Sequence, residues 1–350
     1  MKNLSVMIKP ASAKCNAGCK YCFYRDEVAV RSIKDYGAMP LSTARTLIDK
    51  TLEYLDGGHL SITFQGGEPT LAGYEFFQEF FEYLEEKIAL IAKNAPAPTT
   101  ILSLQTNGLT IDKKWAKLLK KHNVLVGVSL DGTRKLNAQR VACGKEIYPR
   151  ILDAIRILQE EKVDFNVLSV IHKGNVKSGK EIMQDFIKRG FRHLQFIPYL
   201  GEQEEFMLTP EDYGAFLIDT FSIYGEKFNS LERVSVREFD NYIMLLRSGK
   251  AEQCGMNGRC EPQLVFEGDG TAFPCDFYCT DDYVLGNIND CSIDELINSP
   301  IALSFRAPKP QNPACATCPY HSVCLGGCKR YARTPFYCES HKIFFEKHFK

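Results

Sequence analysis

The stretch that decides the fold is residues 4–24, LSVMIKPASAKCNAGCKYCFY. Leu4–Ile8 form a short apolar run that predicts a buried β-strand. The loop that follows carries Cys15, Cys19 and Cys22 in the spacing Cys-x3-Cys-x2-Cys. In α/β folds, ligand-binding residues gather on the loops at the carboxyl ends of the strands. We therefore expect this loop to belong to a functional site.

Three thiolates on one tight loop suit a particular kind of metal centre. They can bind three irons of a cubane cluster and leave the fourth iron open, whereas a structural site closes all of its positions. The alternative is half of a zinc site that a distant residue completes. Against zinc, no further Cys or His occurs within the 35 residues after Cys22.

The composition restricts the function further. The 350 residues carry 43 Lys+Arg, 43 Asp+Glu and 14 Cys. Zero net charge gives no general attraction to nucleic acid or membranes. Lys9 interrupts the apolar start of a would-be signal peptide, and no apolar run is long enough to span a membrane. We expect a cytoplasmic protein, in which clustered cysteines favour metal binding or catalysis over disulfides.

Strand-like and helix-like segments alternate through the first two-thirds of the chain. The predicted strands are near-continuous apolar runs, typical of strands covered on both faces: Leu4–Ile8, Leu60–Phe64, Thr100–Leu104, Val124–Leu130, Val163–Ile171 and His193–Pro198. Between and after them, apolar residues recur at helical spacing in 41–55, 74–93, 112–122, 147–161, 176–189 and 211–228. Six such units predict a parallel sheet in a partial (β/α)6 barrel, because eight are needed to close a full one.

The character changes near Ala251. Ten of the fourteen cysteines lie between residues 254 and 338, among turn signals such as Glu267–Gly270. We expect a domain over residues 1–235 and a small cysteine-rich module, with a connecting helix, over 236–350. Such a loop-rich module needs metal to hold it together. A pair of zinc ribbons or a treble clef remains the alternative.

The cysteine loop resembles that of the radical S-adenosylmethionine (SAM) enzymes, where it binds a [4Fe-4S] cluster whose open iron chelates SAM. The motif Gln65–Pro69 (QGGEP) and Asp131-Gly132 fall where this resemblance requires them. The resemblance implies that Glu68 accepts hydrogen bonds from the SAM ammonium and that Arg140 pairs with its carboxylate. The residues implied to bind SAM are Tyr21, Gly66, Gly67, Glu68, Ser129, Arg140 and Leu194, the last of these packing on the adenine.

The C-terminal cysteines resemble the SPASM module, which holds two auxiliary [4Fe-4S] clusters. This likeness implies that auxiliary cluster I is bound by Cys254, Cys260, Cys275 and Cys328. It implies that auxiliary cluster II is bound by Cys315, Cys318, Cys324 and Cys338. Spacing alone would group Cys328 with Cys324. The remaining cysteines, Cys143, Cys279 and Cys291, are expected to be ordinary thiols.

Among SPASM proteins, the chain is most similar to the anaerobic sulfatase-maturating enzymes, through IKPAS at 8–12, QGGEPTLAG at 65–73, SLQTNG at 103–108 and CGMNGRC at 254–260. The stretch between Asp131 and Arg140 departs from the family, because it is one residue shorter and lacks the usual His-Asn pair. The likeness implies radical oxidation of a sulfatase active-site Cys or Ser to Cα-formylglycine. It implies an unfolded or nascent sulfatase as partner and a ferredoxin or flavodoxin as electron donor.

The same likeness assigns the role of base to Asp276, which directly follows Cys275. Tyr24 is a candidate wall of the substrate pocket, although a core tyrosine is nearly as consistent with the sequence. Two other functions remain open. One is a radical SAM maturase of ribosomal peptides, although the 14 residues before Cys15 leave no room for a leader-recognition domain. The other is a zinc-stabilised binding protein without enzymatic activity.

Overall fold

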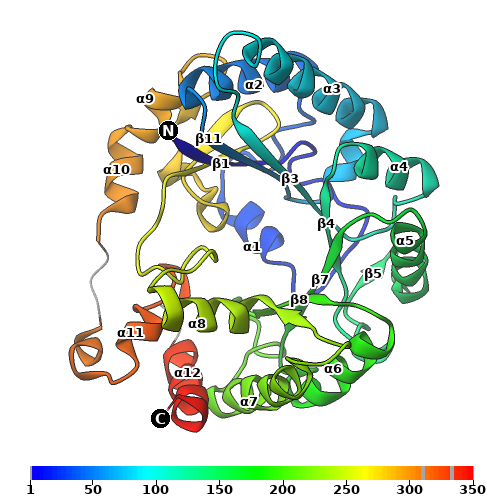
Figure 1. The fold of residues 1–350 in the computed structure, drawn as a ribbon, viewed down its shortest axis with the longest axis vertical. Helices are drawn as coiled ribbons and strands as arrows, with labels where there is room; N and C mark the ends of the chain where they lie inside the picture. The colour runs from blue at the N-terminus through cyan, green and yellow to red at the C-terminus, as the bar shows by residue number, and fades with distance from the viewer. Residues whose placement is uncertain (1, 309–311, 332–334, 350) are drawn as a thin grey trace. The chain divides into compact units, whose positions relative to one another are not determined.

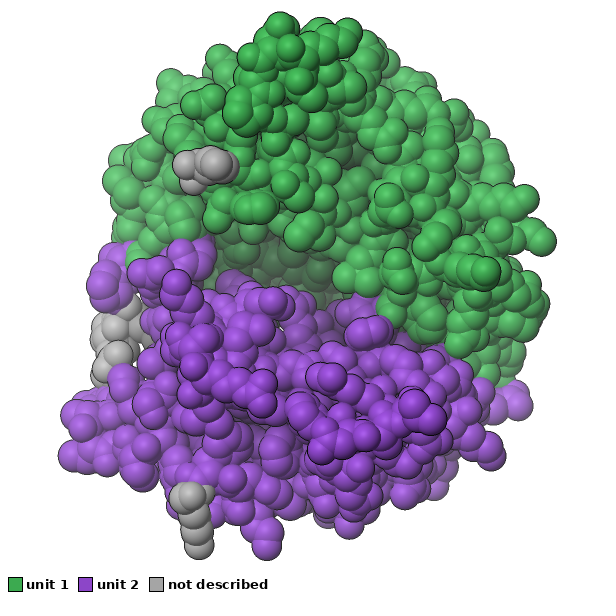
Figure 2. All heavy atoms as spheres, viewed as in Figure 1, with its two compact units in different colours: residues 1–128, 141–165, 262–306 green, residues 129–140, 166–261, 307–350 purple. Residues whose placement is uncertain are grey.

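The computed structural model describes residues 2–308, 312–331 and 335–349. These residues form two compact units that alternate along the chain, coloured separately in Figure 2. Unit 1 contains residues 1–128, 141–165 and 262–306, and unit 2 contains 129–140, 166–261 and 307–350. These two units do not correspond to the predicted domains, 1–235 and 236–350. Each unit combines three separate segments of the chain, whereas the predicted domains are continuous in sequence.

Unit 1 is built on a mostly parallel sheet. The parallel strands are β10 (Gln263–Phe266), β1 (Asn3–Ile8), β2 (His59–Phe64), β3 (Thr99–Thr106) and β4 (Leu125–Ser129), in that order across the sheet. Two short antiparallel strands, β11 (Thr271–Phe273) and β12 (Gly286–Asn287), continue it beyond β10. The pairing of β10 with β1 was not predicted. It brings a segment of the cysteine-rich region into the same sheet as the first strand.

Helices connect the strands of unit 1 (Figure 1). They are α1 (Phe23–Val30), α2 (Leu41–Leu55), α3 (Tyr74–Ile91), α4 (Lys113–Lys121), α5 (Tyr148–Glu160), α9 (Ile293–Ile297) and α10 (Pro300–Arg306). A small hairpin, β5 (Val141–Ala142) and β6 (Lys145–Glu146), precedes α5. The apolar stripe of α3 packs on the sheet, where Phe77 and Phe80 meet the ring of Phe64 edge-on at centroid distances of 4.9 and 5.0 Å. These phenylalanines form the core, as their helical spacing predicts.

Unit 2 has its own parallel strands. These are β7 (Phe165–Ile171), whose first residue belongs to unit 1, β8 (His193–Pro198) and β9 (Ser235–Val236). Its helices are α6 (Gly179–Lys188), α7 (Pro210–Lys227), α8 (Arg237–Ser248), α11 (His321–Cys324) and α12 (Pro335–His348). Helix α12 packs along α7, where the ring of Phe344 lies 5.3 Å from that of Phe221.

The predicted β/α alternation is confirmed. All six predicted strands and their helices are present, with ends that differ by only a few residues. The sequence did not predict α12, because its mixed aromatic and charged residues give no clear apolar stripe. Within the described residues, no helix combines the length and apolar character needed to cross a membrane.

Candidate active site

The three cysteines of the first motif lie together between β1 and α1. Cys22 is the residue immediately before the first turn of α1. Two N–H groups point at the Cys15 sulfur, from Ala17 N at 3.4 Å and Asn107 Nδ2 at 3.7 Å. Burial raises the pKa of the Cys15 thiol to about 11, and the neighbouring Cys19 and Cys22 add to the shift. A bound metal ion reverses this preference for the protonated thiol, because a coordinating thiol loses its proton.

The Gln65–Pro69 turn, which follows β2, is hydrogen-bonded to the backbone that leads into this loop. The backbone N–H groups of Gly67 and Glu68 donate to the carbonyls of Ser12 and Lys14, at 3.1 and 2.7 Å. A Cβ on Gly67 would lie 2.2 Å from the Lys14 carbonyl oxygen. The two predicted motifs are therefore in contact. The close approach that Gly67 permits is to the backbone of the cysteine loop, and its predicted contact with SAM stays a prediction.

Glu68 lies at the centre of a polar network at the ends of β2 and β3. Its Oε1 accepts from Thr70 N (3.2 Å), Thr70 Oγ1 (2.6 Å) and Thr106 Oγ1 (2.8 Å). Its Oε2 accepts from Asn107 N at 2.8 Å. Burial raises the pKa of Glu68, while these donors favour its charged form. Asn107 also bonds Asn16 within the cysteine loop, at 2.8 Å, so the carboxylate and the thiols share one framework.

Asp276, the predicted base, lies in unit 1 with Tyr24 and Gln65. Its Oδ2 accepts from Tyr24 Oη at 2.7 Å and from Gln65 Nε2 at 3.2 Å, and Gln65 also donates to Tyr24 Oη at 2.8 Å. Its Oδ1 faces the Lys9 ammonium at 3.1 Å. Burial raises the pKa of Tyr24, and the Asp276 carboxylate adds to that shift. The sequence predicted Tyr24 and Asp276 but missed Gln65 and Lys9, both of which lie inside motifs that it had singled out.

Arg140 and Ser129, predicted to contact SAM, belong to unit 2. Ser129 ends β4, as predicted. The Arg140 guanidinium donates from Nε and Nη2 to the two oxygens of Asp131, both at 2.9 Å. Asp131 is fully buried and also accepts from Val170 N at 3.0 Å. Asp131 thus fixes the orientation of the arginine predicted to pair with the SAM carboxylate, a role that stays a prediction.

Two further residues predicted to bind SAM are buried. Tyr21 is 5% exposed within the cysteine loop. Leu194 is 2% exposed, but it is the second residue of β8 and pairs with Val167 and Val236. Four residues of strand, about 13 Å, separate Leu194 from Pro198 at the carboxyl end of β8. The adenine contact expected for Leu194 stays a prediction.

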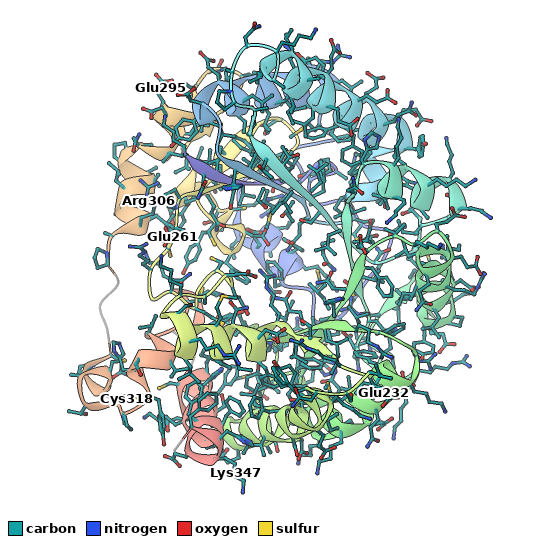
Figure 3. All side chains as sticks on the ribbon, in the orientation of Figure 1. Glu232, Glu261, Glu295, Arg306, Cys318 and Lys347 are labelled. Carbon is teal, nitrogen blue, oxygen red and sulfur yellow. The ribbon has the colours of Figure 1, made fainter. Side chains whose placement is uncertain are left out.

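In unit 2, seven of the eight C-terminal cysteines predicted to bind the auxiliary clusters lie in two groups, one of three and one of four. The Cys254 thiol, whose pKa burial raises to about 11, interacts with Cys328 and Cys260. A Cβ on Gly255 would lie 2.8 Å from Cys328 Cβ, so this approach requires glycine. The other group contains Cys315, Cys318, Cys324 and Cys338, whose thiols interact with one another. Cys318 is labelled in Figure 3. The fourth predicted ligand of the first group, Cys275, is part of unit 1.

The predicted donor set consists of thiolates, which are the usual ligands of iron–sulfur clusters. Among the described residues, no three Cys, His, Asp or Glu side chains converge as they would around one metal ion. A cubane cluster binds its thiolates on separate irons, so its ligands need not converge on a point. Backbone N–H groups aimed at cysteine sulfurs, such as Arg330 N to Cys328 Sγ at 3.4 Å, are a recurrent way of tuning such clusters.

Parallel β/α units with a three-cysteine loop after the first strand define the class of protein. Residues 10–186 match the Radical SAM superfamily, and residues 254–319 match SPASM, an iron–sulfur cluster-binding domain. The chain is 36% identical to the cysteine-type anaerobic sulfatase-maturating enzyme of Clostridium novyi, over 99% of this chain and 96% of that one. It is 29% identical to the serine-type enzyme of Klebsiella aerogenes, over 92% and 79%.

A solved structure of native anSMEcpe, with bound AdoMet and the Cp18Cys peptide, superposes with a TM-score of 0.91 at 36% identity. It covers 99% of this chain and 97% of that one. The partial β/α barrel followed by a SPASM module is therefore the fold of this protein. The chain belongs to the anaerobic sulfatase-maturating enzymes of the radical SAM superfamily.

Proposed function

We propose that the protein oxidises the active-site cysteine of a sulfatase polypeptide to Cα-formylglycine, with Asp276 as the base. The observation that carries this proposal is the Asp276 carboxylate itself. It is buried, it directly follows Cys275, and its Oδ2 bonds Tyr24 and Gln65. Gln65 opens the turn that supports the three-cysteine loop. A proton acceptor is thus built into the same unit as the predicted SAM-binding loop.

The overall reaction balances as a two-electron oxidation. When bound, SAM and three [4Fe-4S] clusters supply the one-electron chemistry: a 5′-deoxyadenosyl radical that takes one Cβ hydrogen, and an acceptor for the electron that the substrate then loses. Asp276 takes the thiol proton, which leaves a carbon–sulfur double bond. Water adds to this thioaldehyde, and hydrogen sulfide leaves to give the aldehyde. Tyr24 and Gln65 hold Asp276 Oδ2 in place with hydrogen bonds while it receives the proton.

The proposed ligands follow the grouping of the thiols. Cys15, Cys19 and Cys22 hold the cluster that binds SAM, and Glu68 and Arg140 bind the ammonium and carboxylate of SAM. Auxiliary cluster I is assigned to Cys254, Cys260, Cys275 and Cys328. Auxiliary cluster II is assigned to Cys315, Cys318, Cys324 and Cys338. The proximity of Cys254, Cys260 and Cys328 within unit 2 supports the crossed use of Cys328.

We further propose that cysteine is preferred over serine as substrate. The chain is 36% identical to a cysteine-type relative and 29% identical to a serine-type one, and the cysteine-type match covers more of both chains. We place the reaction in the cytoplasm, on an unfolded or nascent sulfatase, with a ferredoxin or flavodoxin as the electron donor.

The test is anaerobic incubation of the reconstituted enzyme with SAM, a reductant and a Cys-x-Pro-x-Arg peptide, analysed by mass spectrometry. We expect aldehyde product from this peptide and less from its serine counterpart. The Asp276→Asn variant should still cleave SAM but yield little aldehyde, because the amide cannot take a proton. An unchanged aldehyde yield from this variant would refute the assigned base. SAM cleavage without modification of either peptide would favour the ribosomal-peptide maturase.

A further inference from the structure

The Lys9 side chain, at the end of β1, occupies an unusual position. It is 2% exposed, and its ammonium has three partners within 3.2 Å. It donates hydrogen bonds to Glu27 Oε2 and Cys279 Sγ, both at 3.2 Å, and it forms an ion pair with Asp276 Oδ1 at 3.1 Å. Glu267 Oε1 lies 3.7 Å away. These contacts surround the ammonium and fix its position.

The partners of Lys9 are themselves held in place. Glu27 Oε1 accepts from Cys279 N at 2.9 Å, and Glu267 Oε1 accepts from Arg31 Nη1 at 2.6 Å. All of these side chains belong to unit 1 and are nearly or fully buried. A buried ion pair of this kind contributes little net stability, because desolvation offsets the attraction between the charges. Its geometry around Asp276 is therefore of interest for function rather than for stability.

Charge and packing both favour a fixed, positively charged Lys9. Burial opposes the charged form, but the surrounding carboxylates, led by Asp276, hold the pKa of Lys9 above its ordinary value. The aliphatic stem packs against Gly66, where an added Cβ would lie 3.0 Å from Lys9 Cγ. The backbone N–H of Lys9 donates to Phe266 O at 2.8 Å, so the residue is anchored to β10 as well.

These contacts distinguish the two oxygens of Asp276. Oδ1 is buried and faces Lys9, while Oδ2 faces Tyr24 and Gln65. We propose that Lys9 is a positioning residue for the reaction: it binds Oδ1 of Asp276 to the buried Glu27–Glu267 framework, so that Oδ2 is the oxygen that takes the substrate proton. This inference rests on the proposed function, since it takes Asp276 as the base. Lys9 acts through Asp276 and does not itself touch the substrate.

The role of Lys9 should be measurable in the coupling ratio, which is the amount of 5′-deoxyadenosine formed per aldehyde. Without the ammonium, the carboxylate is held only through Oδ2, by Tyr24 and Gln65, so it is less firmly fixed and the substrate radical loses its proton less efficiently. SAM cleavage depends on the cysteine loop and should persist. We therefore expect Lys9→Met to form at least about tenfold more 5′-deoxyadenosine per aldehyde than the unmodified enzyme, which corresponds to about 1.4 kcal/mol. The peptide KM and the iron content should stay unchanged.

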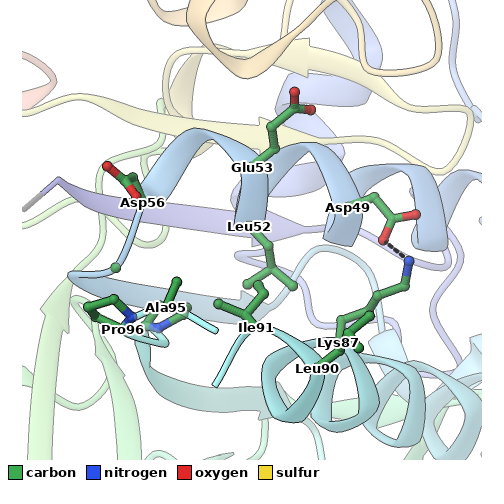
Figure 4. Close-up of a pocket in the computed structure, with 11 residues that line it drawn as sticks. Asp49, Leu52, Glu53, Asp56, Lys87, Leu90, Ile91, Ala95 and Pro96 are labelled. Carbon is green, nitrogen blue, oxygen red and sulfur yellow. Dashed lines mark ion pairs between the residues drawn. The ribbon is translucent and has the colours of Figure 1, made fainter. Parts of the chain in front are cut away.

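A double-variant comparison separates positioning from a structural role. If Lys9 acts only through Asp276, then adding Lys9→Met to Asp276→Asn should cause no further loss of aldehyde. The control is Lys87→Met, which removes a partly exposed lysine paired with Asp49 at 2.8 Å beside a surface pocket (Figure 4). This control variant should form the same amount of 5′-deoxyadenosine per aldehyde as the unmodified enzyme.

Each possible result either supports or overturns the proposed role of Lys9. An unchanged coupling ratio in Lys9→Met overturns the proposal, as does an additive loss in the double variant or a loss of iron from folded Lys9→Met. If Lys9→Met does not accumulate, Glu27→Gln replaces it, since glutamine can still accept from Cys279 N while removing the charge beside Lys9. Excess 5′-deoxyadenosine from that variant supports the proposal, and normal coupling overturns it. A different result would refute the proposed function: normal aldehyde formation by the Asp276→Asn single variant would show that Asp276 is not the base.

Discussion

Replacing Glu68 with glutamine tests whether the carboxylate at the end of the Gln65–Pro69 turn binds SAM. Glu68 is 1% exposed, with three donors on Oε1 and one, Asn107 N, on Oε2. The substitution keeps the size of the side chain but turns one acceptor into a donor. The less costly orientation keeps the three bonds to oxygen and turns the new NH2 group toward Asn107 N.

Two losses follow from that orientation. The Asn107 N–H loses its partner, and leaving a buried donor unpaired costs about 1–3 kcal/mol of stability. The NH2 group also replaces the oxygen with the fewest donors, which is the oxygen with the most remaining capacity to accept from the SAM ammonium. Losing a hydrogen bond to a charged group costs about 1.5–3 kcal/mol, so SAM should bind roughly 10- to 150-fold more weakly.

The assay is anaerobic equilibrium dialysis of SAM against the reconstituted variant, with iron content and thermal unfolding measured on the same sample. Glu79→Gln is the matched control, because Glu79 lies on the surface of α3, where it pairs with Arg45 at 3.1 Å. It should change stability by no more than about 0.5 kcal/mol and leave SAM binding unaltered. Normal SAM affinity in Glu68→Gln, at full iron content, would refute the reasoning.

Two other predictions concern unit 2. Burial raises the pKa of Glu238 to about 7 from 4.5, so the folded protein retains a proton that the unfolded chain releases. The free energy of unfolding should therefore fall as the pH rises from about 4.5 to 7, by on the order of 3 kcal/mol. Glu238→Gln should reduce the difference in unfolding midpoint between pH 5 and pH 8; an equal difference in both proteins would contradict this. Cys324→Ala should lose about four of about twelve irons, while Cys143→Ala keeps them all; equal iron in the two variants would contradict the assignment of Cys324.

The elements of the β/α region could be predicted because each one is encoded locally. In strands such as β2 and β8, buried residues alternate with partly exposed ones, and the apolar residues of Leu60–Phe64 and His193–Pro198 mark them as strands. Helix α2 has the predicted bounds, Leu41–Leu55, because its apolar stripe is regular. The cysteine loop and the Gln65–Pro69 turn were found through fixed spacing, and their contact follows from adjacent parallel strands.

The partners of Lys9 could not be predicted, because they are brought together only by the tertiary fold. Glu27 comes from α1. The other three partners, Glu267, Asp276 and Cys279, lie more than 250 positions after Lys9 in the chain. In the sequence, Lys9 looks like a polar residue that ends a strand. Leu194 shows the complementary case, since its role comes from resemblance alone and its position, second in β8, neither confirms nor contradicts the predicted contact with SAM.

The parallel pairing of β10 with β1 has a consequence for how the protein is made. Leaving the ribosome first, β1 exposes an edge whose partner, Gln263–Phe266, is synthesised some 250 residues later. Contacts of such long sequence separation form slowly, and an unpaired strand edge can associate with other chains in the meantime. Asp276 reaches Lys9 only when β10 has been added to the sheet. A chain cut after residue 235 would therefore lack both a strand of the first sheet and the proposed base, so the cysteine-rich region is not a removable appendage.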